Sequence, residues 1–168
     1  ARDNIAASRM DPSVVTSIAS VDGVVAASAV ATFTTAANLT GAQADVQVFG
    51  FSPNAPGAPQ GLSDGRLPTT AGEIAIDGGG ATIGDVITLD PAGTSLTVVG
   101  LLRGAQFNAL PTMYTTLDTY AEAFALTNPG LPFVPINAVA FDVADGADAS
   151  AVAQRISSEI PDVTGYAL

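Results

Sequence analysis

Carboxylates and tyrosines are the only side chains in this sequence that could transfer protons in a reaction. The 168 residues contain sixteen Asp and Glu and three Tyr, but no His, Cys or Lys. Acid–base chemistry would therefore need two carboxylates tuned by each other, and Glu73 and Asp77 are the most closely spaced pair that flanks an apolar strand. Their four-residue offset puts them at opposite ends of that strand, which argues against a carboxylate hydrolase.

Other kinds of site lack residues that they need. A serine nucleophile requires a base, and the absence of His and Lys removes the usual dyads and triads. Asp142, Asp145 and Asp148 do not follow the alternating spacing of a calcium loop, so a turn and a helix cap explain them better. The triple glycine at residues 78–80 has no P-loop lysine and predicts only an unusual backbone. We predict no enzyme, no metal and no cofactor.

The charge balance excludes nucleic acid as a partner. Five arginines stand against the sixteen carboxylates, which makes the formal net charge −11 and the isoelectric point about 4.1. Contacts with phosphates need Lys and Arg, and attraction to anionic lipid needs a basic cluster. The folded body is therefore expected to bind neither a nucleic acid nor an anionic membrane surface.

The hydropathy pattern predicts no membrane-spanning segment. The mean hydropathy is +0.40, but no apolar run approaches the roughly 18 residues that a spanning helix needs. The longest candidate, residues 24–33, is interrupted by Ser28 and Thr32. The chain also opens without the apolar core of a signal peptide, which suggests an excised fragment.

Helix and strand signals divide the chain into thirds. Capping residues at Asp11 and Pro12 predict a helix, and β-branched and alternating runs predict a hairpin of two strands after it. The Pro- and Gly-rich stretch of residues 52–67 predicts a loop, and turn residues separate the short strands that follow. The predicted strands are residues 24–35, 44–51, 73–76, 86–89 and 95–102, an edge strand at 113–115, and 136–143.

The last third repeats the layout of the first. The same order of features occurs in residues 11–24 and in residues 148–163: an Asp, an amphipathic helix, a corner and the start of a strand. The final strand is expected to start at Val163. A further helix is expected over residues 117–126. These elements predict an α+β fold with two lobes. Residues 1–51 and 136–168 would form an α/β sandwich lobe of strand–helix–strand repeats, and residues 52–135 an inserted, small β-rich outer lobe.

Short motifs in a fixed order run through the middle of the chain. They are Gly50-Phe51-Ser52-Pro53, Leu62-Ser63-Asp64-Gly65-Arg66-Leu67-Pro68, Gly72-Glu73-Ile74-Ala75-Ile76-Asp77, Ile83-Gly84-Asp85-Val86-Ile87-Thr88-Leu89 and Val98-Val99-Gly100-Leu101. Together with the opening and closing helices, they resemble the extracytoplasmic domain of MacB/FtsX-like ABC transporter permeases, over nearly the whole chain. The glycines at 78–80 depart from that pattern, in which a bulkier apolar helical turn is common.

The motif residues are expected to build structure. Gly65 and Gly84 suit tight turns, Arg66 can pair with Glu73 or Asp77, and Asp85 can cap a turn.

The resemblance implies a domain on the extracytoplasmic side of the cell membrane, between two membrane helices of a permease. Such permeases act as dimers and couple cytoplasmic ATP hydrolysis to lipoprotein release, efflux or activation of cell-wall enzymes. The expected partners are an ABC ATPase subunit, reached only through the full-length permease, a second permease copy, and an extracytoplasmic protein or substrate.

Two apolar loops are the predicted contact surfaces for a partner. Phe107 and Leu110 belong to one loop, and Phe133 and Val134 to the other. The alternative for these phenylalanines is a place in the core of the inserted lobe. The alternative for the whole chain is a secreted or cell-surface β-rich binding or adhesion module.

Overall fold

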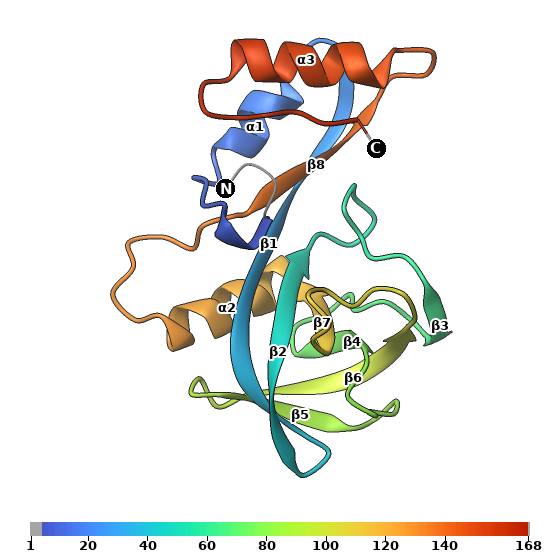
Figure 1. The fold of residues 1–168 in the computed structure, drawn as a ribbon, viewed down its shortest axis with the longest axis vertical. Helices are drawn as coiled ribbons and strands as arrows, with labels where there is room; N and C mark the ends of the chain where they lie inside the picture. Colours follow the sequence, from blue (N-terminus) through green and yellow to red (C-terminus); the bar gives the residue numbers. More distant parts are fainter. Residues whose placement is uncertain (1–4, 168) are drawn as a thin grey trace.

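The computed structural model describes residues 5–167 and has an α+β fold in which one long strand joins two sheets (Figure 1). This strand, β1 (Val24–Leu39), pairs through residues 24–30 with β8 (Ala138–Val143). From Ala31 onward it pairs instead with β2 (Ala42–Phe51). Its 16 residues span about 50 Å at the usual rise of a strand, so β1 reaches through both parts of the molecule.

The first part, here called the helical lobe, consists of the β1–β8 pair and two helices. α1 (Val14–Ala19) and α3 (Ala149–Glu159) lie over one face of this pair. A short 3-10 turn, η1 (Ile5–Ala7), precedes α1 in the chain. The Asp148 carboxylate caps α3 by accepting the N–H of Ser150 at 2.9 Å. The buried side chains that hold the two layers together are Ile18, Val21, Val152 and Ile156.

The second part, the ring lobe, is a closed circuit of six strands. The order is β1, β2, β7 (Thr112–Thr116), β4 (Glu73–Asp77), β6 (Thr94–Leu102) and β5 (Val86–Asp90), which returns to β1. The β2–β7 and β4–β6 pairs are parallel and the rest antiparallel. β3 (Leu62–Gly65) pairs with β6 outside the circuit.

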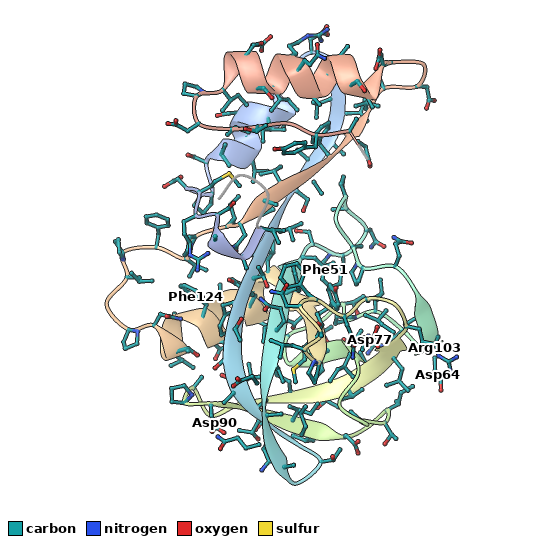
Figure 2. All side chains as sticks on the ribbon, in the orientation of Figure 1. Phe51, Asp64, Asp77, Asp90, Arg103 and Phe124 are labelled. Carbon is teal, nitrogen blue, oxygen red and sulfur yellow. The ribbon has the colours of Figure 1, made fainter. Side chains whose placement is uncertain are left out.

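Alternating apolar residues from these strands fill the interior of the ring lobe. α2 (Leu117–Thr127) packs Tyr120 and Phe124 against Phe33 of β1, with ring centroids 5.3 and 5.5 Å from Phe33. Phe124 on α2 and the exposed Asp64 and Arg103 lie on opposite sides of the ring lobe in Figure 2. Fully buried apolar residues of these strands include Val46, Val48, Ile74, Ile76, Ile87, Leu89, Leu96, Val98 and Met113.

The α+β fold class is confirmed, and three local predictions need correction. Residues 113–115 are not an edge strand, because β7 lies between β2 and β4. The expected strand from Val163 does not form, since that segment makes no ladder and packs beneath α3 instead. The predicted loop at residues 52–67 contains β3.

The lobes meet inside β1. β1 changes partner between Val30 and Ala31, and β2 pairs with β7. The division into residues 1–51 with 136–168 and residues 52–135 stays a prediction, because a sequence pattern reports which face of a strand is apolar but not which strand lies on each edge. Among the described residues no helix is long and apolar enough to cross a membrane.

Candidate functional site

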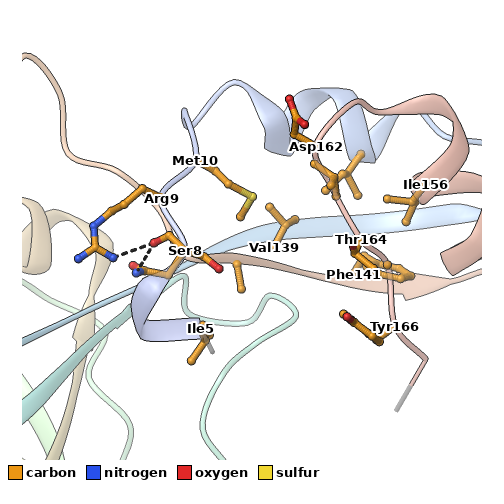
Figure 3. Close-up of a pocket in the computed structure, with 15 residues that line it drawn as sticks. Ile5, Ser8, Arg9, Met10, Val139, Phe141, Ile156, Asp162, Thr164 and Tyr166 are labelled. Atoms are coloured by element: carbon orange, nitrogen blue, oxygen red, sulfur yellow. Dashed lines mark hydrogen bonds between the residues drawn. The ribbon is translucent and has the colours of Figure 1, made fainter. Parts of the chain in front are cut away.

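A groove of about 680 Å³ opens beside β8, between the segments that begin and end the described chain (Figure 3). We call it the β8 groove. Its size is in the range typical of ligand sites. The residues that line it are Ile5, Ser8, Arg9, Met10, Ile18, Asn137, Ala138, Val139, Phe141, Ile156, Asp162, Val163, Thr164, Gly165 and Tyr166.

The last segment of the chain forms one wall of the β8 groove without joining the sheet. The N–H of Gly165 donates to the Ser157 hydroxyl at 2.8 Å, which ties the segment to α3. A Cβ on Gly165 would lie 2.4 Å from the Ala153 carbonyl oxygen, so the chain passes α3 closer than a larger residue allows. Val163 packs against the helical core, and residues 163–167 form no ladder with β8.

The β8 groove has an apolar floor and a charged rim, a composition suited to binding. Val139, Phe141 and Ile156 supply an apolar floor, while Arg9 and Asp162 stand at its rim (Figure 3). The Arg9 guanidinium donates to the carbonyls of Ala6 and Ser8 at 2.8 and 2.7 Å, which holds it to its own segment. Within residues 5–167 no group of His, Cys, Asp and Glu could hold a metal ion.

A buried amide ties the groove to the junction between the lobes. Asn137, only 3% exposed, accepts the N–H of Thr32 at 2.7 Å and donates to the Ser8 carbonyl at 2.9 Å. The Thr32 hydroxyl in turn donates to the Val48 carbonyl at 2.9 Å and accepts from the Gln47 amide. This network links the first segment, β1, β2 and the start of β8.

A second cavity of about 360 Å³ shares Arg9 with the β8 groove. It is lined by Ala6, Arg9, Phe33, Thr34, Gln47, Phe124, Thr127, Asn128 and Leu131. The nearby Tyr120 is 1% exposed, and burial raises the pKa of its hydroxyl despite an opposing effect of the Arg9 charge. No hydrogen bond to this hydroxyl occurs within the described residues.

The Arg66 and Glu73 side chains form an ion pair on the ring lobe. The guanidinium donates to both carboxylate oxygens, and the N–H groups of Thr69 and Thr70 donate to the same carboxylate at 3.1 and 3.2 Å. These hydrogen bonds, led by those from Arg66, lower the pKa of Glu73 from 4.5 to about 2. A carboxyl group with so low a pKa is a poor general acid, so the pair holds the corner before β4 in place.

Asp77 has a separate structural partner. Its carboxylate accepts the N–H of Ala105 at 2.7 Å. Burial, with a smaller effect of the Asp77 charge, raises the pKa of Tyr114 to about 12. Glu73 and Asp77 lie at the two ends of β4, about 13 Å apart along the strand. They therefore do not form the tuned pair that a carboxylate hydrolase would need.

Of the other motif residues, Gly84 lies in a turn, Asp85 follows it, and Gly65 ends β3, where it pairs with Gly100. Gly65 and Gly84 have φ angles of +70° and +95°, and a Cβ on Gly65 would lie 2.3 Å from the Val99 carbonyl oxygen. The Asp85 carboxylate accepts the N–H of Thr82 at 2.8 Å. The three glycines at 78–80 all have positive φ, which is the backbone freedom that their sequence suggests.

The four predicted contact residues belong to two environments. Phe107 is half-buried with its ring edge-on to Phe49 at 5.4 Å, and Leu110 closes the same small loop by donating its N–H to the Phe107 carbonyl. Phe133 is 47% exposed on the connection between α2 and β8, and Val134 beside it packs against the ring-lobe core. The structure does not bring the two loops together into one surface.

Sequence reasoning missed the β8 groove altogether. Its walls come from residues 5–10, 137–141 and 162–166, which are far apart in the chain. The one available signal was the strand-forming sequence after Val163, which predicted a further strand but not its neighbour. In the structure, residues 163–167 form no strand, and residues 163–166 line the groove instead.

The fold is that of extracytoplasmic domains of ABC transporter permeases. The extracellular domain of the noncanonic ABC-type transporter YknZ from Gram-positive bacteria superposes with a TM-score of 0.62 and 16% identity, over 89% of this chain and 81% of that one. The periplasmic region of MacB from Actinobacillus actinomycetemcomitans gives a TM-score of 0.64 and 10% identity, over 90% and 72%. A domain of a putative permease protein from Porphyromonas gingivalis gives a TM-score of 0.58 and 16% identity, over 88% of this chain and 74% of that one.

Sequence comparison adds no further relative. No protein-family profile and no curated protein matches the chain. At identities of 10–16%, the similarity to the three structures establishes the fold, and function has to be argued from it.

Proposed function

We propose that this chain is the extracytoplasmic domain of an ABC transporter permease. In this proposal it binds a substrate or partner protein and couples cytoplasmic ATP hydrolysis to work outside the cytoplasm. The observation that carries the proposal is the agreement of fold over 88–90% of the chain with three such domains. The ordered motifs of the middle segment support the same assignment independently of the coordinates.

The way the two lobes are joined is compatible with coupling. β1 is one uninterrupted strand in both sheets, so a displacement of the helical lobe acts directly on the ring lobe. The Asn137 network adds side-chain hydrogen bonds at the same place. The work proposed is export, lipoprotein release or transmission of mechanical force, and none of these needs a catalytic residue in the domain.

The partners follow from the architecture of such permeases. An ABC ATPase subunit would act on the domain through the membrane part of the full-length protein, without touching the domain itself. A second permease copy would complete the transporter. The acidic surface, with a net charge of −11, disfavours nucleic acid and supports a protein or small-molecule partner.

A topology assay on the full-length gene product tests this proposal. Reporter fusions placed on either side of this segment should show membrane helices flanking it and the segment itself outside the cytoplasm. Purification of the full-length protein in detergent should then bring an ABC ATPase with it. A cleaved signal peptide with no membrane helix would instead identify a secreted binding module and overturn the proposal.

A further inference from the structure

The outer edge of β8 has backbone hydrogen-bonding groups without a strand partner. On β1, the Val30 carbonyl accepts from Asn137, and the Thr32 N–H donates to the Asn137 side chain, so these residues direct their backbone toward β8. Val30 is paired with Ala138, Ser28 with Ala140 and Ala26 with Asp142. Alternation along the strand then turns the N–H and C=O groups of Val139 and Phe141 to the opposite edge.

These groups open into the β8 groove. Val139 and Phe141 both line it, together with Asn137 and Ala138. Met10 forms a single antiparallel bridge with Ile136 just before β8, and beyond this bridge no strand of the described residues pairs with the outer edge. Exposed strand edges are normally covered, shortened or blocked by charge, because they readily pair with another chain.

We propose that the β8 groove binds an extended segment of another protein, which adds to β8 as an antiparallel third strand. Main-chain hydrogen bonds to Val139 and Phe141 would supply affinity. Apolar side chains at alternate positions of the added strand would fill the space beside Phe141, Ile156 and Val163, on the face that α1 and α3 cover. The proposal concerns this chain alone and can fail while the proposed permease function stands.

Charge decides which kind of segment fits. A second copy of this chain carries the same net charge of −11 and is repelled, whereas a basic segment is attracted. Val139, Phe141 and Val143 pack toward α1 and α3, so the exposed Asp142 lies on the other face of β8. Asp162 and Arg9 both lie at the groove rim, and the Arg9 guanidinium is held by the Ala6 and Ser8 carbonyls. The occupant should therefore alternate apolar residues with a Lys or Arg placed across from Asp142.

The test uses a labelled synthetic peptide of about eight residues, within the usual length of a strand. It alternates valine and threonine and carries one lysine near its amino end, which an antiparallel arrangement brings opposite Asp142. Fluorescence anisotropy should show saturable binding. A version of the peptide methylated on the backbone nitrogens that face β8 should bind at least roughly tenfold more weakly, because it cannot donate to the edge.

Two further measurements separate an edge-bound strand from an unspecific contact. Amide exchange followed by NMR should show fast exchange at Val139 and Phe141 in the chain alone, and protection of both when the peptide is present. The Asp142→Lys variant should bind the lysine peptide up to about fivefold more weakly than the unmodified chain does, and should bind a matched glutamate peptide more tightly instead. This variant changes an exposed side chain, so its folding is not at issue.

Three results would overturn the proposal. They are equal binding of the methylated peptide, exchange at Val139 and Phe141 that the peptide does not slow, and self-association of the chain that protects these two amides without any peptide. The last result would assign the edge to a second copy.

Discussion

The Asn137 side chain replaces a missing strand partner for Thr32. β8 ends its pairing with β1 at Val30, and the next N–H of β1 that faces this side belongs to Thr32, which donates to the Asn137 carboxamide oxygen at 2.7 Å. Asn137→Ala leaves this N–H without its acceptor and removes one of the donors to the Ser8 carbonyl, which keeps the Arg9 guanidinium. We expect a loss of about 1–3 kcal/mol in the free energy of unfolding, measured by urea denaturation.

A matched control for this variant is Gln154→Ala, which removes another amide side chain from an exposed position on α3. It should change the free energy of unfolding by less than about 0.5 kcal/mol. Equal effects of the two variants would show that the Asn137 hydrogen bonds do not stabilise the junction.

The Arg66–Glu73 pair should make stability depend on pH in the acid range. The pKa of Glu73 is lowered from 4.5 to about 2 in the folded chain, so its contribution is fully present above pH 4.5 and is lost as the pH falls toward 2. Glu73→Gln should lower the free energy of unfolding by only about 1 kcal/mol at neutral pH, because solvent screens the partly exposed Arg66. It should also reduce the loss of stability that accompanies falling pH in the acid range. Thermal unfolding measured from pH 7 to pH 2 checks both.

Glu122→Gln is the control for the pH profile, because Glu122 is exposed on α2 and belongs to neither ion pair found in the described residues. It should leave the change of melting temperature with pH the same as in the unmodified chain. If Glu73→Gln also left this pH dependence unchanged, the lowered pKa of Glu73 would be contradicted.

Asp148 should matter for α3 through its capping hydrogen bonds. Its carboxylate accepts from the N–H groups of Ser150 and Ala151, so Asp148→Ala should cost about 1 kcal/mol. As a control, Asp145→Ala removes a carboxylate from the turn that precedes this cap, and it should lower the free energy of unfolding clearly less.

Calcium titrated into the unmodified chain should leave its melting temperature unchanged. A rise of several degrees would instead indicate a metal site.

The two phenylalanines of the predicted contact loops should respond differently to truncation. Phe107 packs edge-on against Phe49, so Phe107→Ala should lower the free energy of unfolding by about 1–3 kcal/mol. Phe133 is nearly half exposed, so Phe133→Ala should change it by less than about 0.5 kcal/mol. Denaturant titration of both variants decides which loop remains a candidate partner contact.

If Phe133→Ala also leaves transport by the full-length protein unchanged, the loop at residues 129–135 is not a contact surface. An equal loss of stability in both variants would place Phe133 in the core instead.

Local signals in the sequence determined most of the elements. The acidic and β-branched patterns located α1, α3 and the β1–β2 hairpin, because capping, turn formation and helical periodicity depend on residues only a few positions apart. The positive φ angles at Gly65 and Gly84 follow from the same kind of short-range argument. The α+β class and the resemblance to permease domains followed from the order of these elements.

Only the tertiary structure decided which edges the strands share. Parallel pairing with β2 turns the predicted edge strand at residues 113–115 into the interior strand β7, and the change of partner at Ala31 divides β1 between the two lobes. The β8 groove arises because residues 162–166 pack under α3 and leave the edge of β8 open. These features depend on contacts between residues far apart in the chain, whose free energies no local pattern of side chains reveals.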